Sequence, residues 1–109
     1  MITVTYRPDK RLLTIKGHAG AGDKGHDIVC AAASMVFYNL CQMLLEYNQD
    51  VVFARPPQMQ DKPGNAYVEV TPATAYEAWI DHDIRYALTG FRLLEAQHPE
   101  YLNLKVLRH

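Results

Sequence analysis

The sequence predicts a two-layer α+β domain in which two helices lie on one face of a mixed or antiparallel sheet of four to five strands. Two long segments place apolar residues at helical spacing, and four or five short extended segments are separated by turn residues. The chain has 109 residues, of which 49% are hydrophobic, and this is enough for one modest core. We therefore expect a single domain over residues 1–109.

The chain begins with a predicted strand, turn and strand. Residues 2–6 alternate apolar and polar side chains, and residues 7–10 have the composition of a turn. Residues 12–16 are again extended in character. We expect the second of these strands to end close to His18, where a glycine-rich loop begins.

A long helix is expected after this loop, because apolar residues recur on one flank at about 100° per residue. Its apolar flank comprises Val29, Ala33, Val36, Phe37, Leu40, Met43, Leu44 and Tyr47. Asp27 suits the N-cap and would place Cys30 at the third helical position, at the margin of that flank and next to Ser34. Residues 28–45 carry no formal charge and approach the length of a membrane span, but the polar opposite flank favours a packed amphipathic helix.

The second half of the chain supplies further strands. Residues 51–54 begin an extended stretch that Pro56 and Pro57 interrupt, and such a strand belongs at a sheet edge or beside a bulge. Residues 61–65 have the composition of a turn, and residues 67–70 return as a strand.

A second helical stripe begins at Thr74, keeps its phase through Gly90 and ends before Pro99. The glycine either permits close packing against a neighbouring element or only weakens the helix, and the sequence leaves both interpretations open. Residues 102–107 are expected to add the last strand.

Residues 17–34, GHAGAGDKGHDIVCAAAS, gather the residue types that carry chemistry. A cysteine thiol with an imidazole as base is sufficient for nucleophilic catalysis. Four of the six glycines lie in this run, and we expect their backbone to contact the substrate or to donate amides to an oxyanion. These glycines are Gly17, Gly20, Gly22 and Gly25.

His18 is the predicted base for Cys30. A helix N-terminus contributes about 0.3–1 kcal/mol to a nearby negative charge, and about 2 kcal/mol in a partly buried site, whereas one pKa unit corresponds to about 1.4 kcal/mol. We therefore expect an imidazole to take or share the proton of the thiol. The thiolate would attack a peptide carbonyl, and the protonated His18 would then assist the leaving amine. His26 is the rival candidate for this role, because it lies in the same run.

The segment GHAG, followed by six residues and DIVCAAAS, resembles the signature of the ribosomal-processing cysteine proteases, a family of small bacterial proteins. The resemblance is strong over Gly17 to Ser34. It implies that His18 is the family's histidine, that Cys30 is its nucleophile, and that Asp27 and Ser34 are the accompanying polar residues. It also implies a cytoplasmic, homodimeric endopeptidase that removes a short N-terminal extension, ending in an aromatic pair, from large-subunit ribosomal protein twenty-seven.

Structural explanations of these residues stay open beside the catalytic one. A cysteine on an apolar helix flank is commonly a small buried hydrophobe, and a role as N-cap would by itself account for Asp27. His18 can serve to bond a carbonyl, and Ser34 can bond back to its own helix. Their joint spacing favours the catalytic interpretation.

Two other chemistries fit parts of the same run. Residues 20–25 satisfy G-x-G-x-x-G, but a hairpin precedes them and 109 residues leave no room for two nucleotide-binding halves. His18, His26 and Cys30 make three candidate zinc ligands, whereas a structural site needs four and neither His82 nor His98 is a clear fourth. We therefore expect no metal and no cofactor.

Charge and cysteine content restrict the partners. A net charge of −1 argues against direct binding of nucleic acid, and we expect no membrane partner. Cys30 and Cys41 lie about 16 Å apart along one helix, too far for a disulfide, and no N-terminal signal segment is evident. Both observations favour a cytoplasmic protein.

Three functions stay in competition. The first is the ribosomal-protein endopeptidase, the second a phage-type protease that trims a capsid or scaffold precursor, and the third a non-catalytic module that binds a peptide tail. An edge strand would pair with such a tail, and apolar pockets would choose aromatic side chains. Reaction of Cys30 with a thiol-directed peptide electrophile separates the proteases from the binding module.

Overall fold

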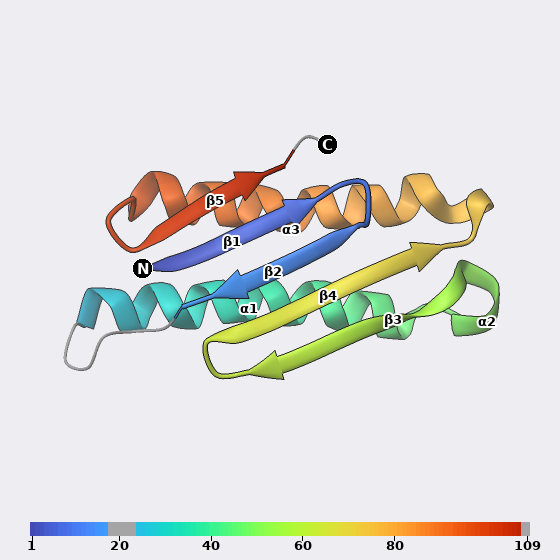
Figure 1. The fold of residues 1–109 in the computed structure, drawn as a ribbon, viewed down its shortest axis with the longest axis horizontal. Helices are drawn as coiled ribbons and strands as arrows, with labels where there is room; N and C mark the ends of the chain where they lie inside the picture. The colour runs from blue at the N-terminus through green and yellow to red at the C-terminus, as the bar shows by residue number, and fades with distance from the viewer. Residues whose placement is uncertain (18–23, 108–109) are drawn as a thin grey trace.

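The computed structural model describes residues 1–17 and 24–107, with side chains described at 1–17 and 28–107. Figure 1 shows long strands and long helices running side by side along the molecule. In chain order the elements are β1 (Ile2–Arg7), β2 (Leu12–Lys16), α1 (Lys24–Glu46), α2 (Gln49–Val52), β3 (Phe53–Lys62), β4 (Asn65–Pro72), η1 (Thr74–Tyr76), α3 (Glu77–Gln97) and β5 (Leu102–Val106).

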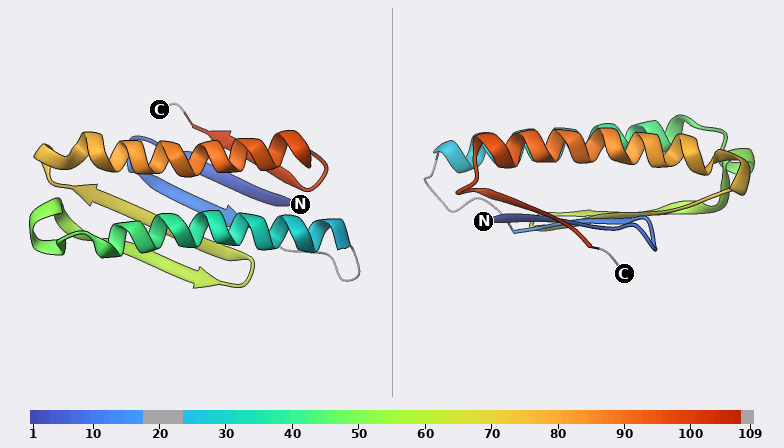
Figure 2. Two further views of the ribbon diagram at one scale, coloured as in Figure 1. Left: turned by 180° about the vertical axis from the view of Figure 1, so that it is seen from behind. Right: turned by 90° about the horizontal axis from the view of Figure 1, so that it is seen from above.

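The strands form a single mixed sheet of five strands in the order β3-β4-β2-β1-β5. β1 and β5 are parallel, and the other neighbours are antiparallel. α1 and α3 lie together on one face of this sheet, as the view from above in Figure 2 shows. The predicted two-layer α+β architecture is therefore confirmed.

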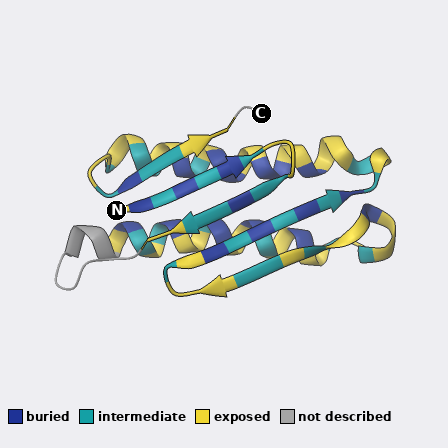
Figure 3. Cartoon of the chain, viewed as in Figure 1, coloured by how far each residue is buried: buried dark blue, intermediate teal, exposed yellow. Residues whose placement is uncertain are grey.

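The core lies between the helices and the sheet, and alternation along the strands creates it. In β1, Ile2, Val4 and Tyr6 are buried toward the helices, while the threonines between them are half-buried on the open face. Figure 3 shows the same alternation along β4. The helices contribute their apolar flanks, with Val29, Leu44 and Phe91 fully buried, so most of the predicted stripes face the sheet. Two residues of the first stripe differ: Met43 is 39% exposed, and Val36 packs against Gly90 of α3.

Gly90 lies where the two long helices approach each other. A Cβ atom built at this glycine would lie 3.2 Å from both methyl carbons of Val36 in α1. Contacts this short require the valine to give way, so the glycine permits close packing of α1 against α3. This settles the question that the sequence left open.

Two boundaries differ from the prediction. Residues 51 and 52 are helical, because the Asn48 side chain accepts hydrogen bonds from the backbone amides of Asp50 and Val51 and so begins a short helix. The strand therefore starts at Phe53. The predicted turn at 61–65 is tighter, since only Pro63 and Gly64 lie between β3 and β4.

The interrupted strand is found where its prolines require it. β3 is an edge strand, and its register with β4 shifts between Phe53 and Arg55 and again between Arg55 and Gln58. Pro56 and Pro57 fall in the second irregularity. Because proline cannot donate to a strand ladder, an edge position with irregular pairing accommodates both residues.

Candidate active site

A cavity of about 350 Å³ lies between the first half of α1 and the end of the β3–β4 hairpin. From α1, Cys30, Ala33, Ser34, Phe37 and Tyr38 line it. From the sheet, the lining residues are Ile2, Ile15, Gly17 and residues 61–66. The structure thus brings two of the predicted site residues of α1, Cys30 and Ser34, to one cavity. Ile2, Ile15 and Phe37 make its walls largely apolar.

Cys30 is half-buried and packs against the core, while Ser34, one turn later, is exposed. A thiol in this position is supported on one side and open to the cavity on the other. That arrangement agrees with the predicted location of Cys30 at the margin of the apolar flank. Cys30 differs in this from the preceding residue, Val29, whose side chain is fully buried.

The start of α1 differs from the prediction. The helix begins at Lys24, so Asp27 is inside its first turn instead of at the N-cap, and Cys30 falls in the second turn. An acidic residue is also favourable within a first turn, so its presence does not by itself define the helix start. Since the effect of the helix dipole declines beyond the first turn, the thiol depends all the more on a base.

Gly17 joins three parts of the site. Its φ of +96° is in the left-handed region, and a Cβ at this position would overlap the Met1 carbonyl oxygen. Its amide donates a hydrogen bond of 3.1 Å to the Gly64 carbonyl at the hairpin turn. Glycine is therefore needed where β2 ends beside both the N-terminus and the hairpin.

Several predicted site residues lie outside the described part of the chain. His18, Gly20 and Gly22 belong to this group, and the side chains of His26 and Asp27 are likewise outside the described side chains. The choice of base between His18 and His26 therefore stays a prediction. Gly25 belongs to the first turn of α1 instead of the loop.

The sequence did not reveal that the hairpin forms a wall of the cavity. Asp61 lies beside α1, where its hydrogen bond and its charge raise the pKa of the Tyr38 hydroxyl. Burial, together with the charge of Asp61, raises the pKa of the Cys41 thiol to about 11. Cys41 is consequently a neutral, half-buried thiol, as expected for a core residue. The sequence shows that residues 61–65 have the composition of a turn, but the position of this turn beside α1 depends on strand register.

Among the side chains that the structure describes, no group of three or more histidine, cysteine, aspartate or glutamate residues could hold a metal ion. Two of the three zinc ligands considered above, His18 and His26, lie outside those side chains. Cys30 and Cys41 are both free thiols.

Residues 1–103 match the family model described as the cysteine protease Prp. The chain belongs to this family. The family resemblance inferred from residues 17–34 is thereby confirmed, and the protein is a cysteine protease. A comparison with curated proteins finds no match.

Solved structures share the fold over nearly the whole chain. The essential ribosomal processing protease Prp from S. aureus, in complex with a substrate peptide, has a TM-score of 0.78 at 21% identity, covering 98% of this chain and 100% of that one. The same protease with a covalently linked product peptide has a TM-score of 0.76 at 22% identity, with the same coverage. SMU.848 from Streptococcus mutans has a TM-score of 0.69 at 26% identity, covering 99% and 93%.

The site suits covalent catalysis on a polypeptide. A half-buried thiol on the wall of a cavity with apolar sides can attack a carbonyl whose neighbouring side chain fills that cavity. Within a cysteine protease family, Cys30 is the cysteine whose position suits the nucleophile, because Cys41 is absent from the lining.

Proposed function

We propose that this cysteine protease removes a short N-terminal extension from a large-subunit ribosomal protein, with Cys30 as nucleophile and His18 as base. The observation that carries the proposal is the position of Cys30 on the wall of the cavity in a chain of the Prp family. The S. aureus relative, a ribosomal processing protease whose structure holds a substrate peptide, supports the choice of client.

The proposed reaction follows the cysteine–histidine scheme. His18 takes the proton from the Cys30 thiol, and the thiolate sulfur bonds to the carbonyl carbon of the scissile peptide, whose π electrons move onto oxygen. Collapse of this tetrahedral species breaks the C–N bond, and protonated His18 gives its proton to the leaving amine. Water then hydrolyses the thioester and regenerates the thiol. We assign the oxyanion donors to backbone amides of the glycine loop.

The cavity walls support an aromatic residue beside the cleaved bond. Ile15 is partly buried beside the core residues Ile2 and Phe37 in the lining, and the volume of about 350 Å³ is within the range of small-ligand pockets. Large apolar rings gain most from leaving water in such a site. An extension that ends in an aromatic pair therefore fits the proposed substrate.

A homodimer and a cytoplasmic location belong to the same proposal. Ile28 and Met35 of α1 are 66% and 57% exposed, and Tyr86 and Leu93 of α3 are exposed as well. Apolar side chains gathered on the outer face of a helical layer support association with a second copy. Sedimentation of the purified protein tests the dimer, and a monomer at micromolar concentration would contradict it.

The decisive experiment compares two cysteine variants on a precursor protein that retains its extension. Cys30→Ala should abolish cleavage, as read by mass spectrometry, while Cys41→Ala, which removes the same atoms from α1 outside the cavity, should cleave like the parent. Cleavage by Cys30→Ala would refute the proposal. Phage capsid precursors, incubated in parallel, test the alternative client.

Two further measurements assign the remaining roles. His18→Ala should lose cleavage and His26→Ala should retain it, and the opposite result would move the base to His26. A peptide electrophile with an aromatic pair should label Cys30 selectively. If the folded protein binds the peptide without labelling or cleavage, it is a binding module.

A further inference from the structure

The hairpin wall of the cavity places a single kind of charge toward α1. In the β3–β4 ladder Asp61 lies opposite Ala66, which is buried on the helix-facing side of β4. Because cross-strand partners project from the same face of a sheet, the Asp61 carboxylate also projects toward α1. The Tyr38 hydroxyl of α1 meets it there and donates a hydrogen bond to the carboxylate.

The neighbouring lysine projects the other way. Lys62 lies opposite Asn65, which in turn lies opposite Lys16 of β2, so these three residues share the open face of the sheet. Asp61 and Lys62 are the two formally charged residues among the described lining. The helix-facing side of that lining is therefore negative, and its negative charge is at the hairpin end.

The separation between this charge and the nucleophile corresponds to a few substrate residues. Tyr38 lies eight residues after Cys30 on α1, which is about 12 Å along the helix axis. An extended peptide advances about 3.3 Å per residue, so a chain lying along α1 covers this distance in about four residues. Both ends of the path line the same cavity.

We propose that Asp61 is a specificity-determining residue that selects a lysine or arginine side chain three or four residues from the cleaved bond, and that Tyr38 positions its carboxylate. This inference rests on the proposed protease function. An aromatic side chain near Cys30 and a basic one near Asp61 would set the register of the substrate, because each fits one end of the cavity and not the other.

The test is a lysine scan. Peptides with an aromatic pair at the cleaved bond carry one lysine at each position from one to six residues away, on either side, and kcat/KM is measured for each. The parent protein should prefer lysine at position three or four on one side by about fivefold over alanine, the size of a partly exposed ion pair. Glutamate at that position should be disfavoured.

Variants assign the preference to the carboxylate. In Asp61→Asn the ratio of kcat/KM for the lysine peptide to that for the alanine peptide should fall to about one, and Asp61→Lys should favour glutamate instead. Tyr38→Phe should reduce the preference and retain its position. Asp9→Asn in the β1–β2 turn, an equal change of net charge away from the cavity, should leave the whole profile unchanged. Increasing salt should weaken the preference of the parent protein.

The outcomes separate this inference from the function on which it rests. Equal kcat/KM across the lysine scan, or a preference that survives in Asp61→Asn, would overturn the role of Asp61 while cleavage itself stands. Cleavage by Cys30→Ala would instead refute the protease mechanism. The salt dependence of the parent protein needs no variant, so a folding defect in Asp61→Asn would not leave the inference untested.

Discussion

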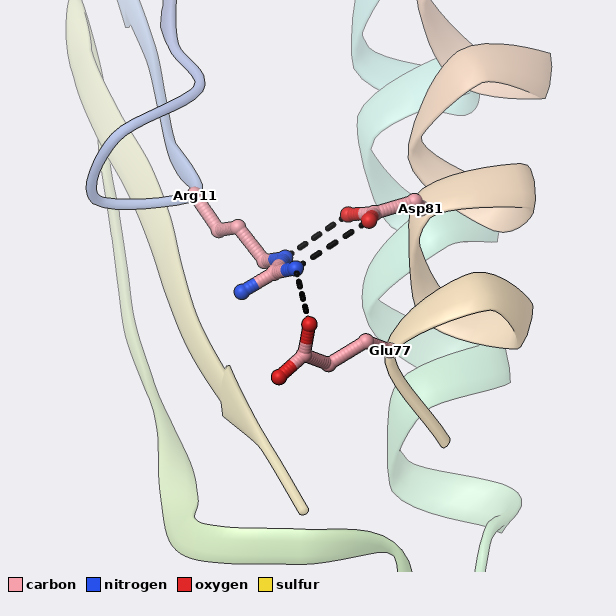
Figure 4. Close-up of polar contacts among 3 residues, drawn as sticks. All are labelled: Arg11, Glu77 and Asp81. Atoms are coloured by element: carbon pink, nitrogen blue, oxygen red, sulfur yellow. Dashed lines mark hydrogen bonds and ion pairs between the residues drawn. The ribbon is translucent and has the colours of Figure 1, made fainter. Parts of the chain in front are cut away.

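The two ends of the molecule are built differently. At one end lie the cavity, Gly17 and the β3–β4 turn, where apolar side chains line the cavity together with the polar groups of Ser34, Tyr38 and Asp61. At the other end, Arg11 after the β1–β2 turn forms ion pairs with Asp81 at 2.7 Å and Glu77 at 3.5 Å (Figure 4). Among the side chains that the structure describes, no residue of an ion pair lines the cavity.

A second polar contact strengthens the far end. The Tyr47 hydroxyl at the end of α1 donates a hydrogen bond of 2.6 Å to Asp83, a buried carboxylate of α3. A buried carboxylate requires such a partner, so this contact connects the two helices specifically. Away from the cavity, ion pairs thus join the β1–β2 turn to α3, and a hydrogen bond joins α1 to α3.

The largest effect should come from Gly17→Ala at the cavity end. The positive φ and the overlap with the Met1 carbonyl both oppose a Cβ atom, so we expect about 3 kcal/mol of lost stability together with loss of cleavage. Urea unfolding measures the first and peptide cleavage the second. Gly64→Asn is the control, because asparagine tolerates its φ of +74°. Equal stability of Gly17→Ala and the parent would show that this end is not sterically restricted.

Next in size is Tyr47→Phe at the far end, which should cost about 2 kcal/mol by leaving Asp83 without its donor. Tyr86→Phe, which changes an exposed tyrosine of α3, should change stability little.

The same hydrogen bond makes stability depend on pH. The bond to Asp83, followed by burial and by the charge of Asp83, raises the pKa of Tyr47 from 10.0 to about 12. Its stabilisation is therefore complete below about pH 10 and is lost as the pH rises toward 12, because the ionised hydroxyl cannot donate. Equal free energies of unfolding for the parent protein and Tyr47→Phe at pH 8 would contradict a stabilising role of this hydrogen bond.

Arg11→Ala should cost about 1 kcal/mol, because it removes a two-point contact with Asp81 at a partly shielded site. Arg11 has a φ of +46°, so Arg11→Gly should be less destabilising than Arg11→Ala although both lose the ion pairs. High salt should reduce the difference between parent and variants. Arg7→Ala, whose pair with Asp9 is 3.6 Å long and exposed, should have almost no effect. A larger loss of stability in Arg7→Ala than in Arg11→Ala would show that the ion pairs of Arg11 do not stabilise this end of the molecule.

The smallest expected effect is a difference in chemical reactivity between two thiols, that of Cys41 in the core and that of Cys30 at the cavity. With its pKa raised to about 11 by burial and by Asp61, Cys41 should stay unlabelled by iodoacetamide at pH 8 while Cys30 reacts. Peptide mapping by mass spectrometry measures both sites in one sample. Faster labelling of Cys41 would contradict the assignment of the two thiols.

Much of the fold could be predicted because its signals are local. Alternation in residues 2–6 and the apolar stripe from Val29 to Tyr47 each identify an element and the face that it buries. The start of α1 was wrong by several residues, since Asp27 is acceptable both before a helix and in its first turn. The strand start was wrong because a cap at Asn48 inserts one short helix.

The sequence by itself determined the layers, the family and the thiol of the proposed site, because periodicity and a local motif need no knowledge of distant contacts. Only the tertiary structure decided that Gly90 lets α1 pack closely against α3, that the Gly17 amide bonds to the hairpin turn, and that Asp61 lies beside Tyr38. These three facts depend on strand register and helix approach, where a shift of one residue would reverse the face on which a side chain projects.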